Sequence, residues 1–399
     1  MSLIRITCPR SRIRTVTRLP ISRRSLLLSS AAALSCSPPK ATGFRGYCFV
    51  ANQVSRSVAV VDLNRFHVRK QIALDAAPAT VLPHPKLTKV FVLAPESGTV
   101  YEIDGIPMSV SRRAKIGNQA VAMQMSPRKD ALWVLSRDPA SLVEIPIDTF
   151  RPGRRIRLSS PPDSFHLFTS DDGATRQAAV AASQDRSIAL VSLTTGTIER
   201  TIPAGAEPSF VLFRKDGRQL LAGSRTDRSL NIFDSATGKT VVRLPLPMEP
   251  RHFCVSSDGG ELFLSGDGMD AVVIVFPYST EIWQTVLAGR APGVLALTES
   301  PSLLLVANPE TNSLTVLDGS QRLVALVEVG EQPSGLLLTP DQQYILVLNE
   351  KSGDLAVVRT YSLRVPKLGT MGARFRSAPV FTMIPVGEMP VSAAVVPWV

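Results

Sequence analysis

Arg251 and His252 are adjacent residues whose side chains together could bind or activate a small molecule. A guanidinium holds anionic or carbonyl groups through charge-assisted hydrogen bonds, and an imidazole titrates near neutral pH. Carboxylates stand at similar places in the chain, at Asp163, Glu207 and Glu249. Each of these residues lies within two positions of a proline that opens an apolar run, so their chemistry depends on the elements that those prolines begin.

The prolines mark a repeat. Pro208, Pro250, Pro292 and Pro333 are 42, 42 and 41 residues apart, and each opens an apolar run. In the unit from 208 to 250, four short apolar runs alternate with the turn sequences RKDG, RTDRS and SATGK. Such a unit predicts a four-stranded antiparallel meander, and a repeat of this length with four strands per unit is typical of a β-propeller.

The two chain ends predict how the ring closes. The unit that begins at Phe44 has three predicted strands and lacks an inner one, whereas Val391–Val399 is a predicted inner strand with no strand after it. We expect the C-terminal strand to complete the N-terminal blade, because this pairing removes the open sheet edges. Predicted inner strands near residues 79, 120, 163, 209, 251, 293, 334 and 391 give an all-β fold of eight four-stranded blades over residues 44–399. Seven blades are the alternative if the irregular unit at 120–158 is incomplete.

Several segments resemble a known repeat. YCFVANQVSRSVAVVDL, LLLVANPETNSLTVLDG and YILVLNEKSGDLAVV resemble the YVTN-type propeller repeat, and FTMIPVGEMP resembles its end. The resemblance covers about residues 44–399. It implies a propeller from a family that includes secreted binding and surface proteins and that is similar to lactonase-type propellers. Familiar members of the family usually have seven blades, so eight blades depart from that pattern.

The positive charge is concentrated near the N-terminus. Residues 1–61 contain ten Lys or Arg and no Asp or Glu, which accounts for nearly all of the formal net charge of +11. A nucleic-acid-binding face would spread its basic residues over the folded part of the chain. We therefore expect no nucleic-acid partner.

The first 36 residues resemble an export signal. Ser22-Arg23-Arg24-Ser25-Leu26-Leu27 resembles a twin-arginine signal, and the apolar run after it is too short to span a bilayer. Ala33-Leu34-Ser35-Cys36 resembles an imperfect lipobox, so either Cys36 is lipidated and attaches the protein to a membrane, or the signal is cleaved near Ser35. Residues 37–43 are a predicted tether. The expected location is periplasmic or at the cell surface, and a mitochondrial transit peptide is the alternative.

The chemically active residues are expected at one face of the propeller. The bends that lead into the inner strands and the turns between second and third strands open on the same face, around the mouth of the central channel. The predicted ligand-binding residues are Asp163, Glu207, Ser209, Glu249, Arg251, His252 and Ser334. Residues of the second-to-third turns should lie near them, namely Arg137, Asp185, Arg186, Arg225, Asp227, Asp267 and Asn308. The alternative is structural, since Asp163, Glu207 and Glu249 could cap bends, and His166 could be a satisfied buried histidine.

The last blade carries a basic insertion. Residues 359–376 contain Arg359, Arg364, Lys367, Arg374 and Arg376 and no acidic residue, and the loop should leave the face opposite the channel mouth. It is either a solvated loop or a contact for an anionic partner or membrane surface.

These features favour a monomeric binding or interaction module whose ligand is an unidentified small molecule or protein. No cofactor is expected, and the absence of clustered His and Cys gives no metal site; Cys48 and Cys254 should lie too far apart for a disulfide. The alternative is a lactonase-like hydrolase in which Glu207, Arg251 and His252 supply acid, cation and base. A haem-binding propeller would depend on His166 or His252.

Overall fold

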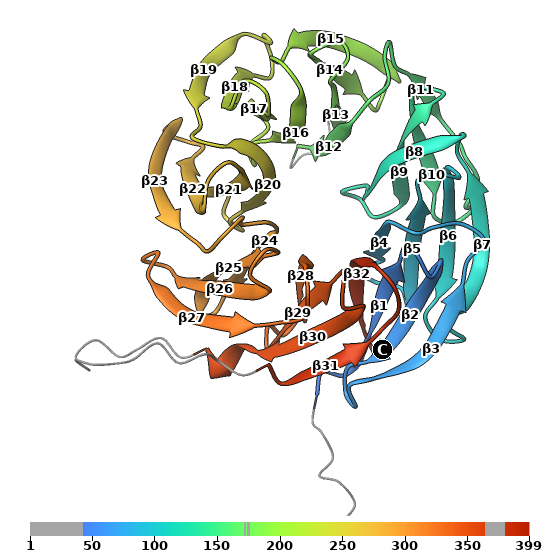
Figure 1. Ribbon diagram of the computed structural model, residues 1–399. Coiled ribbons are helices and arrows are strands. Elements are labelled where there is room, and N and C mark those ends of the chain that lie inside the picture. The colour runs from blue at the N-terminus through green and yellow to red at the C-terminus, as the bar shows by residue number, and fades with distance from the viewer. Residues whose placement is uncertain (1–42, 171–172, 174–175, 364–379, 399) are drawn as a thin grey trace, which may run out of the picture. The chain divides into compact units, whose positions relative to one another are not determined.

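The computed structural model describes residues 43–170, 173, 176–363 and 380–398. The predicted signal peptide, the tether up to residue 42 and the insertion from 364 to 379 lie outside the described residues. Residues 41–399 form one compact unit. Its described residues build eight four-stranded antiparallel sheets in a ring, as Figure 1 shows. The prediction of an all-β propeller with eight blades is therefore confirmed, and the seven-bladed alternative is wrong.

Each blade runs outward from the central channel through four strands. The inner strands are β4 (Thr80–Pro83), β8 (Gln119–Met125), β12 (Ser164–Thr169), β16 (Pro208–Phe213), β20 (Glu249–Val255), β24 (Leu295–Glu299), β28 (Pro333–Leu338) and β32 (Pro390–Pro397). The second strands are β1 (Gly46–Asn52), β5 (Lys89–Ala94), β9 (Ala131–Asp138), β13 (Arg176–Ala182), β17 (Gln219–Ser224), β21 (Leu262–Asp267), β25 (Ser302–Asn308) and β29 (Tyr344–Asn349).

The outer half of each blade is formed by two further strands. The third strands are β2 (Ser57–Asp62), β6 (Thr99–Asp104), β10 (Ser141–Pro146), β14 (Ser187–Ser192), β18 (Ser229–Asp234), β22 (Ala271–Phe276), β26 (Ser313–Asp318) and β30 (Asp354–Arg359). The outermost are β3 (His67–Ala73), β7 (Ser109–Lys115), β11 (Arg155–Arg157), β15 (Thr197–Pro203), β19 (Thr240–Pro245), β23 (Glu281–Leu287), β27 (Leu323–Glu328) and β31 (Thr382–Pro385). Blade 1 contains β1–β3 and β32, and blades 2 to 8 follow in chain order from β4–β7 to β28–β31. The irregular unit at 120–158 is a complete blade whose outermost strand, β11, is short.

Helical structure is confined to one turn in the described part of the chain. The 3-10 helix η1 (Thr360–Ser362) follows β30 and leads into the insertion. No helix among the described residues has the length and apolar character needed to cross a membrane.

The ring is closed by pairing the two ends of the chain. β32 lies antiparallel to β1, with Cys48 opposite Val395 and Phe49 opposite Ala394. The Asn52 side-chain amide donates to the carbonyl oxygen of Val386 at 2.9 Å, which ties the same junction to blade 8. The predicted completion of the N-terminal blade by the C-terminal strand is therefore confirmed.

Burial follows from the stacking of blades around the ring. All six residues of β2 and all six of β29 are buried, whereas Ile72 is the one buried residue of the outermost strand β3. A strand covered by neighbouring blades on both faces needs an apolar run without alternation, which the sequences SVAVVD and YILVLN provide. The packed faces bury Phe49 of blade 1 with Val90 of blade 2 in one cluster.

A buried asparagine recurs at the end of the second strand, where neighbouring blades meet. Asn52, Asn308 and Asn349 end second strands and are fully buried. The Asn349 side-chain amide donates to Asp354 Oδ1 at 2.7 Å, and a Cβ added to Gly330 of the preceding blade would lie 2.6 Å from Asn349 Nδ2. The asparagine therefore fills the space that the glycine leaves open. The expectation that Asn308 lies at the channel mouth is wrong, because its side chain turns inward and donates to Thr315 Oγ1 at 2.8 Å.

Candidate functional site

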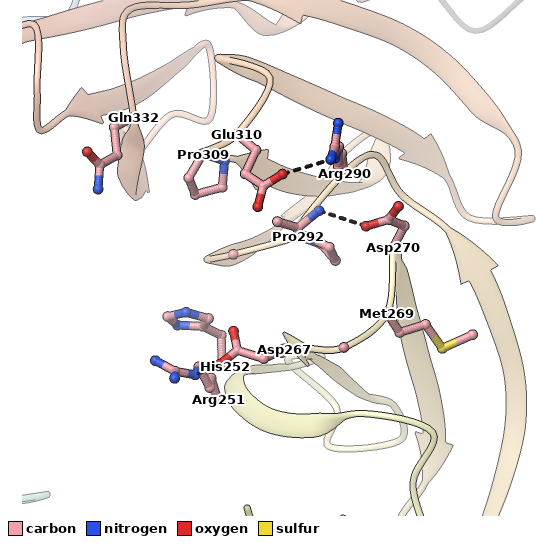
Figure 2. Close-up of a pocket in the computed structure, with 14 residues that line it drawn as sticks. Arg251, His252, Asp267, Met269, Asp270, Arg290, Pro292, Pro309, Glu310 and Gln332 are labelled. Carbon is pink, nitrogen blue, oxygen red and sulfur yellow. Dashed lines mark hydrogen bonds and ion pairs between the residues drawn. The ribbon is translucent and has the colours of Figure 1, made fainter.

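Two cavities share Arg251 and His252 in their walls. The larger, of about 870 Å³, is lined by Arg251, His252, Gly266, Asp267, Gly268, Met269, Asp270, Arg290, Ala291, Pro292, Gly293, Pro309, Glu310 and Gln332. The smaller, of about 380 Å³, is lined by Asp163, Ser183, Glu207, Pro208, Ser209, Arg225, Arg251 and His252. These residues come from second-to-third turns and from bends into inner strands, so the cavities lie on the channel-mouth face. Figure 2 shows Arg251 and His252 side by side at one end of the larger cavity.

Strand bulges place the residues that follow the repeated prolines. Ser209, Arg251 and Ser334 are each left out of the ladder between the inner and second strands of their blades. An unpaired extra residue bends the strand and re-aims its side chain. At Arg251 the bulge brings backbone close to Gly266, where an added Cβ would lie 1.8 Å from the carbonyl oxygen of Glu249. Glycine is therefore required at this position.

Arg251 already has a partner. Its guanidinium forms an ion pair with Asp267, at the end of the neighbouring strand β21. The side chains are 44% and 55% exposed, and ion pairs between exposed groups contribute little to stability. A ligand anion can therefore compete with Asp267 for this guanidinium.

His252 is held neutral by its surroundings. Its half-buried imidazole has a pKa below the usual value because burial disfavours the charged form and because Arg251 repels a proton, although Asp267 opposes the shift. Within the described residues the ring takes part in no side-chain hydrogen bond or ion pair. The ring nitrogen lone pair is therefore available to accept a proton or to bind a metal ion carried by a ligand.

Arg225 is the charged residue of these cavities that lacks a partner in the described part of the chain. It follows β17, lines the smaller cavity and forms none of the ion pairs found there. Its Nε atom is buried without a hydrogen-bond partner among the described residues. An anion that reaches the Arg225 guanidinium need not displace an ion-pair partner among the described residues, as it must at Arg251. The sequence placed Arg225 near the mouth but outside the ligand-binding set.

The acidic residues of the smaller cavity already form ion pairs or hydrogen bonds with neighbouring residues. Asp163 Oδ1 pairs with Arg137 Nη2 at 2.5 Å, and its Oδ2 accepts the backbone N–H of Ser183 at 2.7 Å. Glu207 accepts a hydrogen bond from Thr226 Oγ1 at 2.8 Å. Both contacts tie bends to neighbouring turns, in line with the structural alternative for these two carboxylates.

Three other predicted residues contact neighbouring strands and blades. Ser209 lines the smaller cavity and donates to the carbonyl oxygen of Gly223 at 3.2 Å. Glu249 pairs with Arg228 at 3.3 Å, and the Ser334 hydroxyl donates to the carbonyl oxygen of Pro390 at 3.4 Å. Neither Glu249 nor Ser334 lines either cavity.

The larger cavity contains charged residues that the sequence prediction missed. Arg290 Nε pairs with Glu310 Oε2 at 3.0 Å, and Asp270 Oδ1 accepts the backbone N–H of Ala291 at 3.0 Å (Figure 2). Arg290 stands two positions before Pro292, whereas Glu207 and Glu249 directly precede their prolines. The signal for Arg290 in the sequence is therefore its place one residue further from the repeated proline.

The other histidine and cysteine candidates lie outside the cavities. His166 Nδ1 accepts the backbone N–H of Phe213 at 3.3 Å, and burial lowers the pKa of its ring. Cys48 and Cys254 are not disulfide-bonded, and burial raises the pKa of the Cys254 thiol to about 11. Among the described residues there is no group of three or more His, Cys, Asp and Glu suited to a metal ion.

Comparisons with known proteins show the fold. No protein-family model and no curated protein matches the chain. A solved structure described as dihydro-heme d1 dehydrogenase NirN in complex with DHE is 13% identical, with a TM-score of 0.67 over 88% of this chain and 75% of that one. A Kuenenia stuttgartiensis hydrazine synthase is 19% identical, with a TM-score of 0.55 over 71% of this chain and 95% of that one.

A third similar structure is a functionally unknown protein from Desulfotomaculum acetoxidans DSM 771. It is 14% identical, with a TM-score of 0.57 over 72% of this chain and 98% of that one. Identities this low show a shared propeller fold and do not transfer an activity. None of the comparisons bears on the YVTN type of the repeat.

Proposed function

We propose that the chain is an exported, non-catalytic binding module of the YVTN type that holds a small anionic molecule at the channel-mouth face. Its main support is the meeting of two cavities at Arg251 and His252, beside Arg225, whose Nε has no hydrogen-bond partner in the part of the chain that the structure describes. Concave sites with a few convergent polar groups are the usual places for small ligands. The other two arginines that line these cavities, Arg251 and Arg290, form ion pairs with Asp267 and Glu310, so a ligand anion would interact chiefly with Arg225.

A carboxylate-bearing tetrapyrrole is the first ligand class to test. One structural neighbour is described as a dihydro-heme d1 dehydrogenase in complex with DHE, and this description motivates the choice. The larger cavity, of about 870 Å³, is within the usual range for sites that enclose ligands of drug size or larger. Arg251 in the shared wall and Arg225 in the adjoining 380 Å³ cavity could hold carboxylates, and the neutral His252 could bind a central metal ion.

Titration with hemin, followed by its absorbance, tests this proposal. We expect the wild-type protein to bind, His252→Ala to change the absorbance of the bound form, and Arg225→Ala to weaken binding. Arg186→Ala is the matched control, because Arg186 belongs to the equivalent turn of the preceding blade and lines neither cavity. If neither hemin nor any member of a panel of small carboxylates binds, the proposal is wrong.

Export is proposed from the first 36 residues. Arg23→Lys with Arg24→Lys should retain the protein in the cytoplasm, since the twin-arginine receptor reads the arginine pair and not its charge alone. Cys36→Ala should release the protein from membranes if Cys36 is lipidated. Normal secretion of the double lysine variant would contradict the signal.

A lactonase-like hydrolase is the second candidate. It is favoured because Glu207, Arg251 and His252 all line the 380 Å³ cavity. His252 could accept a proton from water, while Arg251 stabilises a developing oxyanion. Turnover of sugar lactones that is lost in His252→Ala would replace the binding module with this enzyme.

A further inference from the structure

The face opposite the channel mouth contains the point where the chain enters the propeller. The backbone N–H of Gly43 donates to the carbonyl oxygen of Asn64 at 3.4 Å, in the turn between the third and outermost strands of blade 1. The N–H of Trp398 donates to the carbonyl oxygen of Arg45 at 3.0 Å, so the C-terminal end lies at the same place. Anything attached to the N-terminal side of Gly43 therefore joins the propeller at this face.

Apolar and aromatic side chains are exposed around this entry point. Trp398 of blade 1 is 40% exposed, Leu87 and Ile106 of blade 2 are 44% and 77% exposed, and Tyr361 of blade 8 is 66% exposed. Leu87 and Ile106 lie in strand connections, Tyr361 in η1 and Trp398 directly after β32, all on the face opposite the cavities. Exposed apolar groups gathered in this way mark an interaction surface, and Trp and Tyr favour the boundary between membrane and water.

The same turns carry cations without partners. Arg45, Arg65 and Lys86 are exposed, and none of the ion pairs found in the described part of the chain involves them. Two carboxylates on this face keep their charge but are held by backbone donors, since Asp104 accepts the N–H of Ile106 at 3.0 Å and Asp341 accepts the N–H of Gln343 at 3.1 Å. Free cations interleaved with apolar side chains complement an anionic lipid surface.

We propose that this surface, the entry face, rests on an anionic lipid bilayer and directs the channel mouth away from it. The entry face consists of Arg45, Arg65, Lys86, Leu87, Ile106, Tyr361 and Trp398. Apolar side chains buried in the lipid and cations attracted to anionic headgroups both add to membrane affinity. The inference goes beyond the proposed ligand site and can fail independently of it, because the two sites lie on opposite faces and are tested with different probes.

Vesicle co-sedimentation of the full chain tests the entry face. Vesicles of phosphatidylglycerol with phosphatidylcholine are compared with phosphatidylcholine alone, at low and physiological salt. The test variant is Arg45→Glu with Arg65→Glu and Lys86→Glu, and the matched control is Arg56→Glu with Arg186→Glu and Lys351→Glu on exposed turns of the mouth face. All proteins keep residues 1–36, so the basic residues of this predicted signal contribute equally to each, and equal melting temperatures show that the variants fold.

The entry-face variant should lose about tenfold or more in affinity for anionic vesicles, and the control should change by less than about twofold. Brominated lipids should quench the fluorescence of Trp398, and Trp398→Phe should abolish that quenching while Trp283→Phe does not. Equal losses in the two triple variants, or no loss in either, would overturn the proposal. Wild-type protein that does not bind anionic vesicles more tightly than neutral ones would also overturn the proposal. The entry face would then be better suited to an acidic protein partner.

Discussion

Arg251 pairs with Asp267 across the bulge that opens the inner strand of blade 6, whereas Arg225 on blade 5 has no partner in the described part of the chain. The two arginines therefore differ as anion-binding groups. A ligand must displace Asp267 to use Arg251 fully, whereas the Arg225 guanidinium forms no ion pair among the described residues that a ligand would have to displace.

We expect Arg225→Ala to weaken hemin binding by about 1.5–3 kcal/mol, the scale of hydrogen bonds to charged groups. Arg251→Ala with Asp267→Ala should cost less, because the exposed ion pair is removed as a unit. Calorimetric titration measures both, with Arg186→Ala as the control. A larger loss in the double variant would make Arg251 the main anchor.

Hemin binding should also depend on pH. The pKa of His252 in the free protein is lowered by burial and by Arg251, so the ring is neutral at pH 7. Because only the neutral ring can bind the hemin iron, affinity should fall as the pH is lowered below the ordinary imidazole value of about 6.5. His252→Gln should flatten this dependence, measured between pH 7.5 and 5. An unchanged slope in that variant would remove His252 from contact with the ligand.

Stability should depend on pH through His166. Its folded-state pKa is lowered by burial, and its Nδ1 accepts a backbone hydrogen bond that a proton would break. The unfolded chain therefore binds protons more readily, so this contribution is fully present above the unfolded pKa of about 6.5 and is lost as the pH falls below it. His166→Gln should reduce the fall in melting temperature between pH 7 and 5. If the melting temperature falls equally in the wild-type protein and in His166→Gln, titratable groups other than His166 cause the fall.

The sequence could predict the ring because its period is set locally. Each turn and apolar run is encoded within about ten residues, and the proline spacing counts the blades without any knowledge of side-chain contacts. Closure also followed from the ends, since β1 lacked an inner neighbour and β32 lacked an outer one.

The site was harder to predict because its contacts cross blades. The sequence brought Arg251 and Arg225 to the mouth, but the pairing of Arg251 with Asp267 depends on a bulge. Asn308 was misplaced because a position at the end of a strand does not reveal whether its side chain turns inward. Arg290 and Glu310 meet across two blades, a contact that no spacing rule contained.

Blade junctions should be sensitive to small changes at glycine. In Gly330→Ala the added Cβ would lie 2.5 Å from Ser352 Oγ and 2.6 Å from Asn349 Nδ2, so we expect a loss of about 1–3 kcal/mol in the free energy of unfolding. Gly319→Ala is the control, because the nearest atom to its Cβ would be 3.7 Å away. Thermal unfolding compares the two, and equal melting temperatures would show that the junction relaxes without cost.

Removal of the closing strand should be severe. Deletion of residues 391–399 takes most of β32 from β1 and exposes a sheet edge and the flanks of two blades. We expect loss of soluble protein or a large fall in melting temperature. A truncated protein that melts within a few degrees of the full chain would show that the ring does not need this strand.

Native mass spectrometry of the protein purified from its own cells tests the ligand site most directly. We predict an additional small-molecule mass on the wild-type protein and on Arg186→Ala, and its loss from Arg225→Ala with His252→Ala. A bound mass that persists in that double variant, or no bound mass on the wild-type protein, would contradict a ligand site at the channel mouth.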